Sequence, residues 1–505
     1  MESSTLSIFS DESAVAKPPF ASVKLVSRSA VRALTSFSAL LVVLLTARVY
    51  GACRDSISDP DIWWHLLNAR SILTNWKLPS HDTYSSTALG APVIDHEWLS
   101  ELLYYFPFNR FGAQGLFLVF AVVLSALLVA VFCITLRQCR DPFVAGALSF
   151  VGGLLAMVGF SPRTQHFGWL CFVGILAILL RFRARQYAPL WLVPILFCLW
   201  INCHGSWLIG LTIFGIFVGA GLVRRDIGRL SAHPWDPVQL KQLMITGLAS
   251  VVALLVNPLG YRLLLYPFDM MFRQTLNIAN VQEWASVDFN GGRGKLVAMV
   301  LAAIFCMALV ARKRWRIDDA ILTGFVVYCG LSHMRFLLLA GIVLPPILAS
   351  YMGRDRSSTV RPERRILNSV LILITISVCA WSFPSENKLN ADLRNYFPTD
   401  AVDFLRTQPQ RGQIFNLYQW GGYLEWSLPA SQPLIDSRTD IFEYNGVLRD
   451  YLDITQLKRS QELLDKYKVR YVLYPSDAAL SYFLSKSQRW QRVYHDERAD
   501  IYSRR

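Results

Sequence analysis

The sequence predicts an α-helical polytopic membrane protein that ends in a small α/β domain. The 505-residue chain is 53% hydrophobic and only 17% charged, whereas an ordinary soluble domain has about 25% charged residues. Long apolar runs recur as far as residue 382, and most approach the roughly 20 residues that cross a bilayer as a helix. After residue 383 short strand-like and helix-like segments alternate, which is typical of a small α/β sheet.

The N-terminal segment, residues 1–28, is rich in serine, and we expect it to be disordered and cytoplasmic. The first apolar run follows at 32–50, after Lys24 and Arg28. This run is long enough to span a bilayer and has no small-residue cleavage site at its end. It therefore predicts a retained transmembrane helix rather than a cleaved signal peptide.

About eleven transmembrane helices are expected in a membrane domain that covers residues 29–383. The criterion is a run of roughly 17 to 25 predominantly apolar residues, and several of the runs are short by that measure. The expected spans lie at residues 32–50, 113–136, 143–160, 168–180, 188–203, 206–223, 243–257, 295–311, 318–333, 336–351 and 365–382.

Basic residues predict how these spans are oriented. If the N-terminus is cytoplasmic, the five arginine-rich loops that begin near residues 137, 181, 224, 311 and 354 all fall on the cytoplasmic side. The loops at 54–98 and 258–294 and the C-terminal domain at 384–505 are then extracytoplasmic, and the plasma (inner) membrane is the expected location. Scattered clusters of this kind account for the net charge of +14, so we expect no nucleic-acid partner.

The C-terminal segment predicts four short buried strands, QIFN at 413, QPLID at 432, VRYVLYP at 469 and RVYHD at 492. Helical patterns begin at Thr399, which can cap a short helix, and at Val447. The nine cysteines lie mostly in apolar runs without metal-site spacing, so no disulfide framework is expected. No phosphate-binding loop or hydrolase motif occurs, which argues against a soluble nucleotide donor.

The first outer loop contains the strongest candidate for chemistry. Asp59 and Asp61 stand at the start of an expected helix, and His65 follows Asp61 by one turn, so their side chains share a face. A carboxylate there can remove a proton if burial raises its pKa, and the group can alternatively contribute oxygen ligands to a divalent cation. The structural alternative is an Asp-Pro turn with a capping Asp.

Other polar residues gather on the same predicted face of the membrane. Six of the eight histidines fall in outer loops or at outer helix ends. Because ionisable groups at membrane depth usually line a cavity, we expect a shared outward-facing pocket, although polar outer loops alone are an alternative. Its predicted substrate-binding residues are His96, Glu97, Arg163, His166, Asn202, His204, His333 and Arg335.

The block QWGGYLEW in the C-terminal domain is a further candidate for substrate binding. Gly421 and Gly422 permit close backbone approach, and Trp420 and Tyr423 are able to form an aromatic wall. The alternative is a glycine turn in a small sheet.

These residues resemble a known group of enzymes. The segment SDPDIWWHLLNARSIL resembles the first outer loop of GT-C type membrane glycosyltransferases, and Asp59 with Pro60 matches the Asp-Pro pair of oligosaccharyltransferase catalytic subunits. Asp61 is followed by Ile62, so the Asp-Glu version of other branches does not match. The block at 419–426 loosely resembles the Trp-Trp-Asp-Tyr-Gly block, but Gln419 and Trp420 replace Trp-Asp. Recognition of a peptide sequon is therefore not carried over.

The chain also resembles uncharacterised bacterial membrane proteins with the blocks DPDxWWH, HEWLSE, NxHG and WGGYL. The resemblance implies a GT-C-like membrane domain that transfers a sugar from a polyprenyl-phosphate donor to a glycan, lipid or protein acceptor. It implies inverting transfer with Asp61, or else Asp59, as general base and arginines or histidines against the phosphate. A divalent cation is possible but no ligand set is assigned. The rivals are a flippase of lipid-linked sugars and a non-catalytic membrane scaffold.

Overall fold

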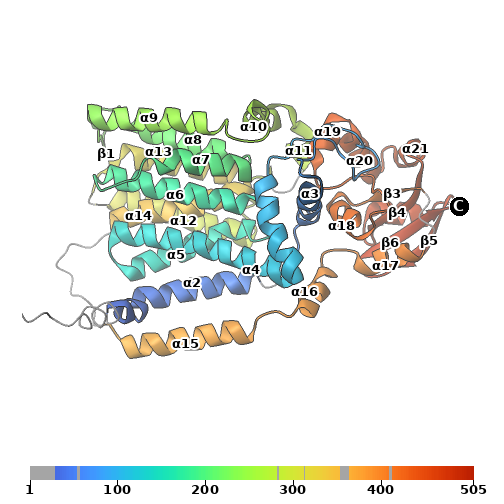
Figure 1. Ribbon diagram of the computed structural model, residues 1–505, viewed down its shortest axis with the longest axis horizontal. Coiled ribbons are helices and arrows are strands. Elements are labelled where there is room, and N and C mark those ends of the chain that lie inside the picture. The colour runs from blue at the N-terminus through green and yellow to red at the C-terminus, as the bar shows by residue number, and fades with distance from the viewer. Residues whose placement is uncertain (1–28, 54–56, 281–283, 312, 353–362, 409–411) are drawn as a thin grey trace, which may run out of the picture.

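The computed structural model describes residues 29–53, 57–280, 284–311, 313–352, 363–408 and 412–505, so the expected disorder of 1–28 lies outside the described residues. In this part, eleven helices run along a common axis, with the C-terminal domain at one end of the bundle (Figure 1). They are α2 (Phe37–Cys53), α4 (Trp98–Cys139), α5 (Pro142–Ala156), α6 (Gln165–Arg183), α7 (Leu192–Cys203), α8 (Trp207–Ala220), α9 (Pro237–Ala253), α12 (Gly292–Val310), α13 (Ile317–Ser332), α14 (Leu337–Met352) and α15 (Arg365–Trp381).

Each expected span overlaps one of these helices, and the polytopic helical architecture is confirmed. Five segments of the described chain are long and apolar enough to cross a membrane. A sixth qualifies if α15 and α16 (Glu386–Leu393), which are bent by 67°, count as one span. Helices α2, α7 and α8 are apolar but shorter. The number eleven therefore stays a prediction.

The core of the bundle is the contact between α14 and α5. Helix α14 is buried along almost its whole length. Its Gly341 faces Gly152 of α5 so closely that a Cβ added at Gly152 would lie 2.4 Å from the Gly341 carbonyl oxygen. Small residues at such a crossing let two backbones approach and pack, which is how helices associate in a membrane.

Helix α4 has a break that separates an outer segment from a span. Gly112 has φ +59° and ψ −144°, a conformation that favours glycine. Glu386 accepts hydrogen bonds from the backbone N–H groups of Ala113 (2.9 Å) and Gln114 (3.0 Å), so it caps the second part of the helix. The first part, with its aromatic residues, crosses the end of the bundle (Figure 1), as expected for a helix along the membrane surface.

Among the described residues, the arginine-rich loops after α4, α6 and α8 lie at the end of the bundle opposite the C-terminal domain (Figure 1). Strands β1 (Leu230–Ser231) and β2 (Trp315–Arg316) pair there in parallel and join the loop after α8 to the loop after α12. Arg183 at the end of α6 binds Asp318 (2.9 Å) and Asp319 (2.5 Å) at the start of α13. The basic loops and the outer loop at 57–98 therefore lie at opposite ends, as the sequence predicts.

The C-terminal domain is a small α/β unit, as expected. Its four-stranded sheet has the order β3-β4-β6-β5, in which β3 and β4 are parallel and the other neighbours antiparallel. The elements are α17 (Thr399–Thr407), β3 (Gln413–Asn416), α18 (Tyr418–Ser427), α19 (Thr439–Tyr444), α20 (Val447–Thr455), α21 (Ser460–Lys466), β4 (Val469–Pro475), α22 (Ala479–Ser485), β5 (Trp490–His495) and β6 (Ala499–Arg504).

Four details of this domain differ from the sequence predictions. The segment QPLID is not a strand, because only Pro433 forms a bridge, with Ile414. Thr399 does not cap α17 through its side chain. The helical pattern from residue 447 is divided between α20 and α21, and Leu457 between them has φ +58°. The strand β6, which carries alternating polar residues, was not predicted.

Several contacts join the C-terminal domain to the loops at this end of the bundle, two of them through helices α18 and α19. Helix α18 packs on α3 (Ile62–Asn75), where Gly422 comes close enough that an added Cβ would lie 3.1 Å from the Pro60 carbonyl oxygen. Glu443 of α19 accepts hydrogen bonds from the backbone N–H groups of Leu276 (2.9 Å) and Asn277 (2.8 Å) in α11 (Thr275–Asn280), which follows α10 (Tyr261–Arg273). The domain therefore fixes both outer loops at this end of the bundle.

Candidate functional site

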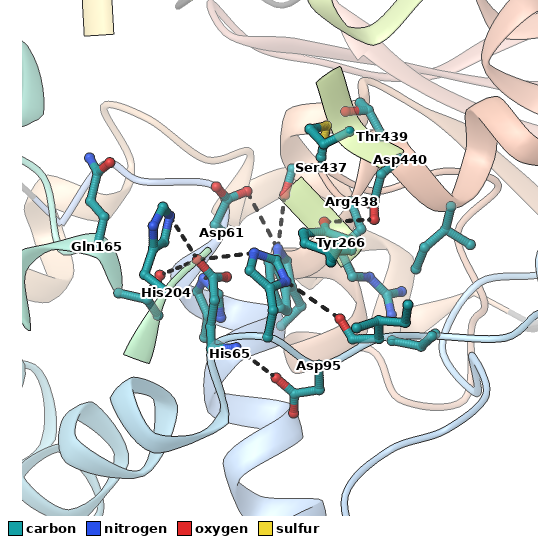
Figure 2. Close-up of a pocket in the computed structure, with 18 of the residues that line it drawn as sticks. Asp61, His65, Asp95, Gln165, His204, Tyr266, Ser437, Arg438, Thr439 and Asp440 are labelled. Carbon is teal, nitrogen blue, oxygen red and sulfur yellow. Dashed lines mark hydrogen bonds and ion pairs between the residues drawn. The ribbon is translucent and has the colours of Figure 1, made fainter. Parts of the chain in front are cut away.

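A polar pocket of about 190 Å³ lies between the first outer loop, the ends of the helices and the C-terminal domain. Figure 2 shows its side chains pointing toward one another from these separate segments. Seven of the predicted site residues line it, which is the convergence that the sequence predicts. They are Asp61, His65, His96, Glu97, Arg163, His204 and Arg335.

Helix α3 positions the first part of the site. The Asp59 carboxylate accepts a hydrogen bond from the backbone N–H of Asp61 (3.0 Å), which closes a turn across Pro60. Asp61 occupies the N-cap position without a side-chain capping bond, so Asp59, the expected cap, forms the preceding turn instead. The His65 N–H donates to the Asp61 carbonyl (3.1 Å), and Asp61 and His65 both face the pocket as their spacing predicts.

Asp59 lies behind the pocket rather than in its lining. Its Oδ2 accepts hydrogen bonds from the Arg163 Nε (2.6 Å) and the Ser161 hydroxyl (2.6 Å). Asp59 is buried, and Arg163 lines the pocket. The carboxylate therefore holds a guanidinium at the pocket wall, and a charge-assisted bond of this length is strong.

Glu97 is the polar centre of the pocket. Its Oε1 accepts a hydrogen bond from the Thr164 hydroxyl (2.7 Å) and lies 3.2 Å from the Nε2 of His204. The Nε2 of His96 lies 3.6 Å from the same oxygen, and the Nε2 of His65 lies 3.5 Å from Oε2. One buried carboxyl thus faces three imidazole rings, and we call His65, His96, Glu97 and His204 the imidazole cluster.

A second carboxylate orients His65. The Nδ1 of His65 lies 2.8 Å from Oε1 of Glu101, which also accepts a hydrogen bond from the Asn68 amide (3.1 Å). When Oε1 of Glu101 carries no proton, the His65 Nδ1 donates to it, and the lone pair of the His65 Nε2 then faces Glu97. A carboxylate that fixes the tautomer of an imidazole is a common arrangement in sites that move protons.

Burial dominates the electrostatics of this pocket. It raises the pKa of Asp95 to about 6 and that of Glu97 to about 7, because the ionised carboxylates lose their hydration. It also lowers the pKa of His96, and lowers that of His65 and His204 well below the usual value, so these rings are neutral at pH 7. Glu97 therefore titrates near neutral pH, which suits a group that accepts and releases a proton.

Asp440 of the C-terminal domain and Tyr266 of α10 are pocket residues that the sequence did not single out. Asp440 and Tyr266 line the pocket, and the Tyr266 hydroxyl lies 3.2 Å from the Asp440 carboxylate. Burial raises the pKa of Asp440. Arg438 also lines the pocket and binds Asp436 (2.5 Å) and Asp82 (2.7 Å). The sequence indicates Arg438 together with Asp436 at a strand end near the glycine block, and the adjoining segment SRTD, which follows an apolar run, was the signal for Asp440.

Three predicted pocket residues lie outside the lining. His166 is buried, and its ring nitrogens lie 2.7 Å from the carbonyls of Arg163 and Gly159. Asn202 accepts from the Trp98 indole (3.0 Å) and donates to two backbone carbonyls. The Nδ1 of His333 contacts the Trp284 carbonyl (2.7 Å). These side chains hold the pocket wall, and a role in substrate binding stays a prediction.

The aromatic residues of the glycine block lie at the contact between the domains. The Trp420 indole donates to the Tyr396 carbonyl (3.2 Å), and Tyr423 packs against Trp63 of α3 with ring centres 5.1 Å apart. Neither residue lines the pocket around Glu97. The first glycine of the block, Gly421, is required by close packing, because an added Cβ would lie 2.3 Å from the Ile435 carbonyl oxygen. The substrate-binding role predicted for Trp420 and Tyr423 stays a prediction.

A metal does not fit the available donor set. Among the described residues, His96, Glu97 and His204 bring three ligand atoms within 4.8 Å of one another. The Nδ1 of His204, however, accepts a hydrogen bond from the Ser206 N–H (3.0 Å), so the neutral ring carries its proton on Nε2. A protonated nitrogen cannot ligate a metal, and two ligands remain. The alternative set around Asp59 is occupied by the Arg163 guanidinium.

Solved structures of similar architecture identify the fold. Archaeal oligosaccharyltransferase AglB from Archaeoglobus fulgidus, in complex with an inhibitory peptide and a dolichol-phosphate, matches with a TM-score of 0.50 at 13% identity, over 86% of this chain and 69% of that one. ArnT from Cupriavidus metallidurans bound to undecaprenyl phosphate matches with a TM-score of 0.53 at 12% identity, over 92% and 97%. This chain has the GT-C glycosyltransferase fold. No family model and no curated protein matches it.

The GT-C fold accounts for the architecture around the pocket. The match to ArnT extends over nearly all of both chains, so the membrane domain and the C-terminal domain belong to one fold. The resemblance expected from the first outer loop is confirmed at this level. At 12–14% identity the likeness shows the fold alone, and the chemistry must be argued from the pocket itself.

Proposed function

We propose that this chain is a membrane glycosyltransferase that transfers a sugar from a polyprenyl-phosphate-linked donor to an acceptor at the extracytoplasmic face of the plasma membrane. The observation that carries the proposal is the pocket, where three arginines and several carboxylates converge at the end of a GT-C bundle. The arginines suit a phosphate, and the carboxylates suit a hydroxyl that must lose its proton.

The donor side of the pocket is formed by Arg163 and Arg335. Arg163 is held by Asp59 at 2.6 Å, and Arg335 lies over the Trp284 ring at 4.4 Å, so both cations are oriented before a ligand arrives. The solved neighbours bind dolichol-phosphate in one case and undecaprenyl phosphate in the other. We extend that class of lipid phosphate to this chain and assign the two arginines to its phosphate.

The acceptor side of the pocket is acidic. Asp61, Asp95, Glu97 and Asp440 line it. In the proposed inverting reaction the acceptor hydroxyl gives its proton to one of these carboxylates while its oxygen attacks the anomeric carbon. The bond from that carbon to the phosphate oxygen breaks, and its electron pair stays on the phosphate beside the arginines. Asp61 is the first candidate for the base from its place in the outer loop.

The rival functions fit the geometry less well. A flippase of lipid-linked sugars is expected to carry its polar site near the middle of broken helices. Here the polar pocket lies at one end, and the acidic pair Asp318 and Asp319 is neutralised by Arg183 at the other. A non-catalytic scaffold gives no reason for a carboxyl whose pKa lies near 7 in a pocket.

The test is transfer by the purified protein. Wild type and Asp61→Asn would be incubated with a panel of polyprenyl-phosphate sugars and cell-envelope extracts, and labelled products would be counted. The proposal expects transfer by wild type and at least a tenfold loss in the variant. Movement of the carrier across a vesicle membrane without transfer would identify a flippase. A protein that neither transfers nor moves any donor would be a scaffold.

A further inference from the structure

The imidazole cluster contains an unusual set of tautomers around Glu97. His204 carries its proton on Nε2, because its Nδ1 accepts from Ser206, and so it donates to Oε1 of Glu97. With Oε1 of Glu101 unprotonated, His65 carries its proton on Nδ1, facing that oxygen. The Nδ1 of His96 points to the Ile94 carbonyl at 3.4 Å. Glu97 thus faces one N–H donor and two nitrogen lone pairs.

Two of the imidazole contacts to Glu97 leave room to tighten. The Nε2 atoms of His65 and His96 lie 3.5 and 3.6 Å from the Glu97 oxygens, which is longer than a usual hydrogen bond. A carboxylate and a nitrogen lone pair repel each other unless a proton lies between them. A proton taken up by Glu97 would therefore allow either pair to form a hydrogen bond.

We propose that Glu97, assisted by His65 and His96, is the group that receives the acceptor proton, and that the transfer needs no divalent cation. This inference rests on the proposed glycosyl transfer and deepens it. The acceptor O–H bond breaks and its proton goes to the Glu97 carboxylate. The oxygen forms the new bond to the anomeric carbon, and the phosphate leaves with the electron pair of the broken bond.

Asp61 takes a different part in this scheme. It lines the pocket and is only partly buried, whereas Glu97 is 7% exposed. The Asp61 carboxylate lies 3.4 Å from the Trp64 indole nitrogen. We assign Asp61 to hydrogen bonding with substrate hydroxyls and Glu97 to the proton. Arg163, bound to Asp59, supplies the positive charge beside the first outer loop that a cation would otherwise provide.

The groups around Glu97 set the pH at which it can act as base. Burial is the main cause of its raised pKa, and the hydrogen bond from Thr164 and the charge of Arg335 oppose it. Ionised Glu97 is required, so the transfer rate is expected to rise with pH up to about 7 and then to level. The titratable and charged groups that surround it are Asp59, His65, Asp95, His96, Glu101, His204, Tyr266, Arg335 and Asp440.

The decisive variant is Glu97→Gln, which keeps the shape and the acceptor oxygen for Thr164 but cannot take the proton. Transfer is expected to fall by about 10²- to 10⁴-fold, the usual contribution of a general base, while binding of undecaprenyl phosphate stays at the wild-type level. Glu462→Gln, at an exposed ion pair of the C-terminal domain, is the matched control. Wild-type transfer should survive chelation of divalent cations. Full transfer by Glu97→Gln, or loss on chelation with recovery on adding Mn²⁺ or Zn²⁺, would overturn the proposal.

A second measurement does not depend on finding the sugar. Infrared difference spectra between pH 5.5 and 8.5 should show protonated-carboxyl bands, one lost near pH 6 with Asp95 and one lost as the pH rises through about 7 with Glu97. Glu97→Gln should lack only the band lost near pH 7, whereas Asp61→Asn should keep both bands. If wild type shows the band lost near pH 7 but uses no donor, the glycosyltransferase proposal fails, while the assignment of that pKa to Glu97 is retained. If transfer is found but the band is unchanged in Glu97→Gln, the cluster assignment fails alone.

Discussion

At the scale of single residues, Asp59 shows how one side chain can serve both the local chain and the site. One of its oxygens closes the turn at Asp61, and the other holds Arg163 and Ser161. The two functions can be separated by substitution, because an amide keeps the acceptor for the turn but loses the charge.

We expect Asp59→Asn to lower the free energy of unfolding by about 2 kcal/mol, the contribution of a hydrogen bond to a charged group. Asp59→Ala should cost about 1 kcal/mol more, since the turn is lost as well. Thermal unfolding in detergent measures both. Asp226→Asn, which removes an exposed ion pair with Arg314 at the other end of the bundle, should leave the midpoint unchanged. Equal midpoints for the Asn and Ala variants would refute the role of Asp59 in the turn.

The sequence could predict which residues converge on the pocket only where the side of the membrane determines the answer. His65, Glu97 and His204 all lie at the end of the bundle that carries the C-terminal domain, and the sequence predicted all three for one side of the membrane. His166 and His333 lie on the same side, but their rings point to backbone carbonyls. Whether such a ring faces the pocket or the backbone depends on how the helix end is rotated about its axis. A single sequence does not indicate this rotation where the helix end is polar on all faces.

At the scale of elements, the break in α4 illustrates a boundary that hydropathy alone does not place. The apolar run was expected from residue 113, and the structure confirms a change of direction at Gly112. What the sequence did not indicate is the partner, Glu386, which lies 274 positions later and binds the two freed N–H groups. The strand β6 was also not predicted, because its sequence has only a weak strand pattern. It is held as a strand by its pairing with β4 and β5, which is known only from the fold.

Gly112→Ala should therefore be strongly destabilising. Its φ of +59° is unfavourable for alanine, and the new Cβ would lie 2.4 Å from Glu386 Oε1. The strain and the loss of the cap together are worth about 2 to 4 kcal/mol, seen as a lower unfolding midpoint. Gly215→Ala in α8, where a Cβ meets nothing within 4 Å, should be neutral or slightly stabilising. Similar losses in both variants would mean that the break is not held by Glu386.

At the scale of the whole molecule, the C-terminal domain closes the pocket. Asp440 reaches the pocket from α19, Tyr266 reaches it from α10, and Glu443 fixes α11 beside them. The sequence predicted a domain on this side of the bundle, but it did not predict that the domain supplies pocket residues. Such contacts depend on how two domains dock, and no local pattern reports that.

The pocket must open to the extracytoplasmic side if the proposed donor is to reach it. A cysteine-free variant carrying either Gln488→Cys in the C-terminal domain or Gln186→Cys after α6 would test this, since both positions are exposed at opposite ends of the bundle. A membrane-impermeant maleimide should label the cysteine at 488 in intact cells and the cysteine at 186 only after permeabilisation. The arginine-rich loops near 186 give the physical reason, because positive charge is retained on the cytoplasmic side. The reverse pattern would place the pocket in the cytosol, where a lipid-linked sugar facing outward could not serve as donor.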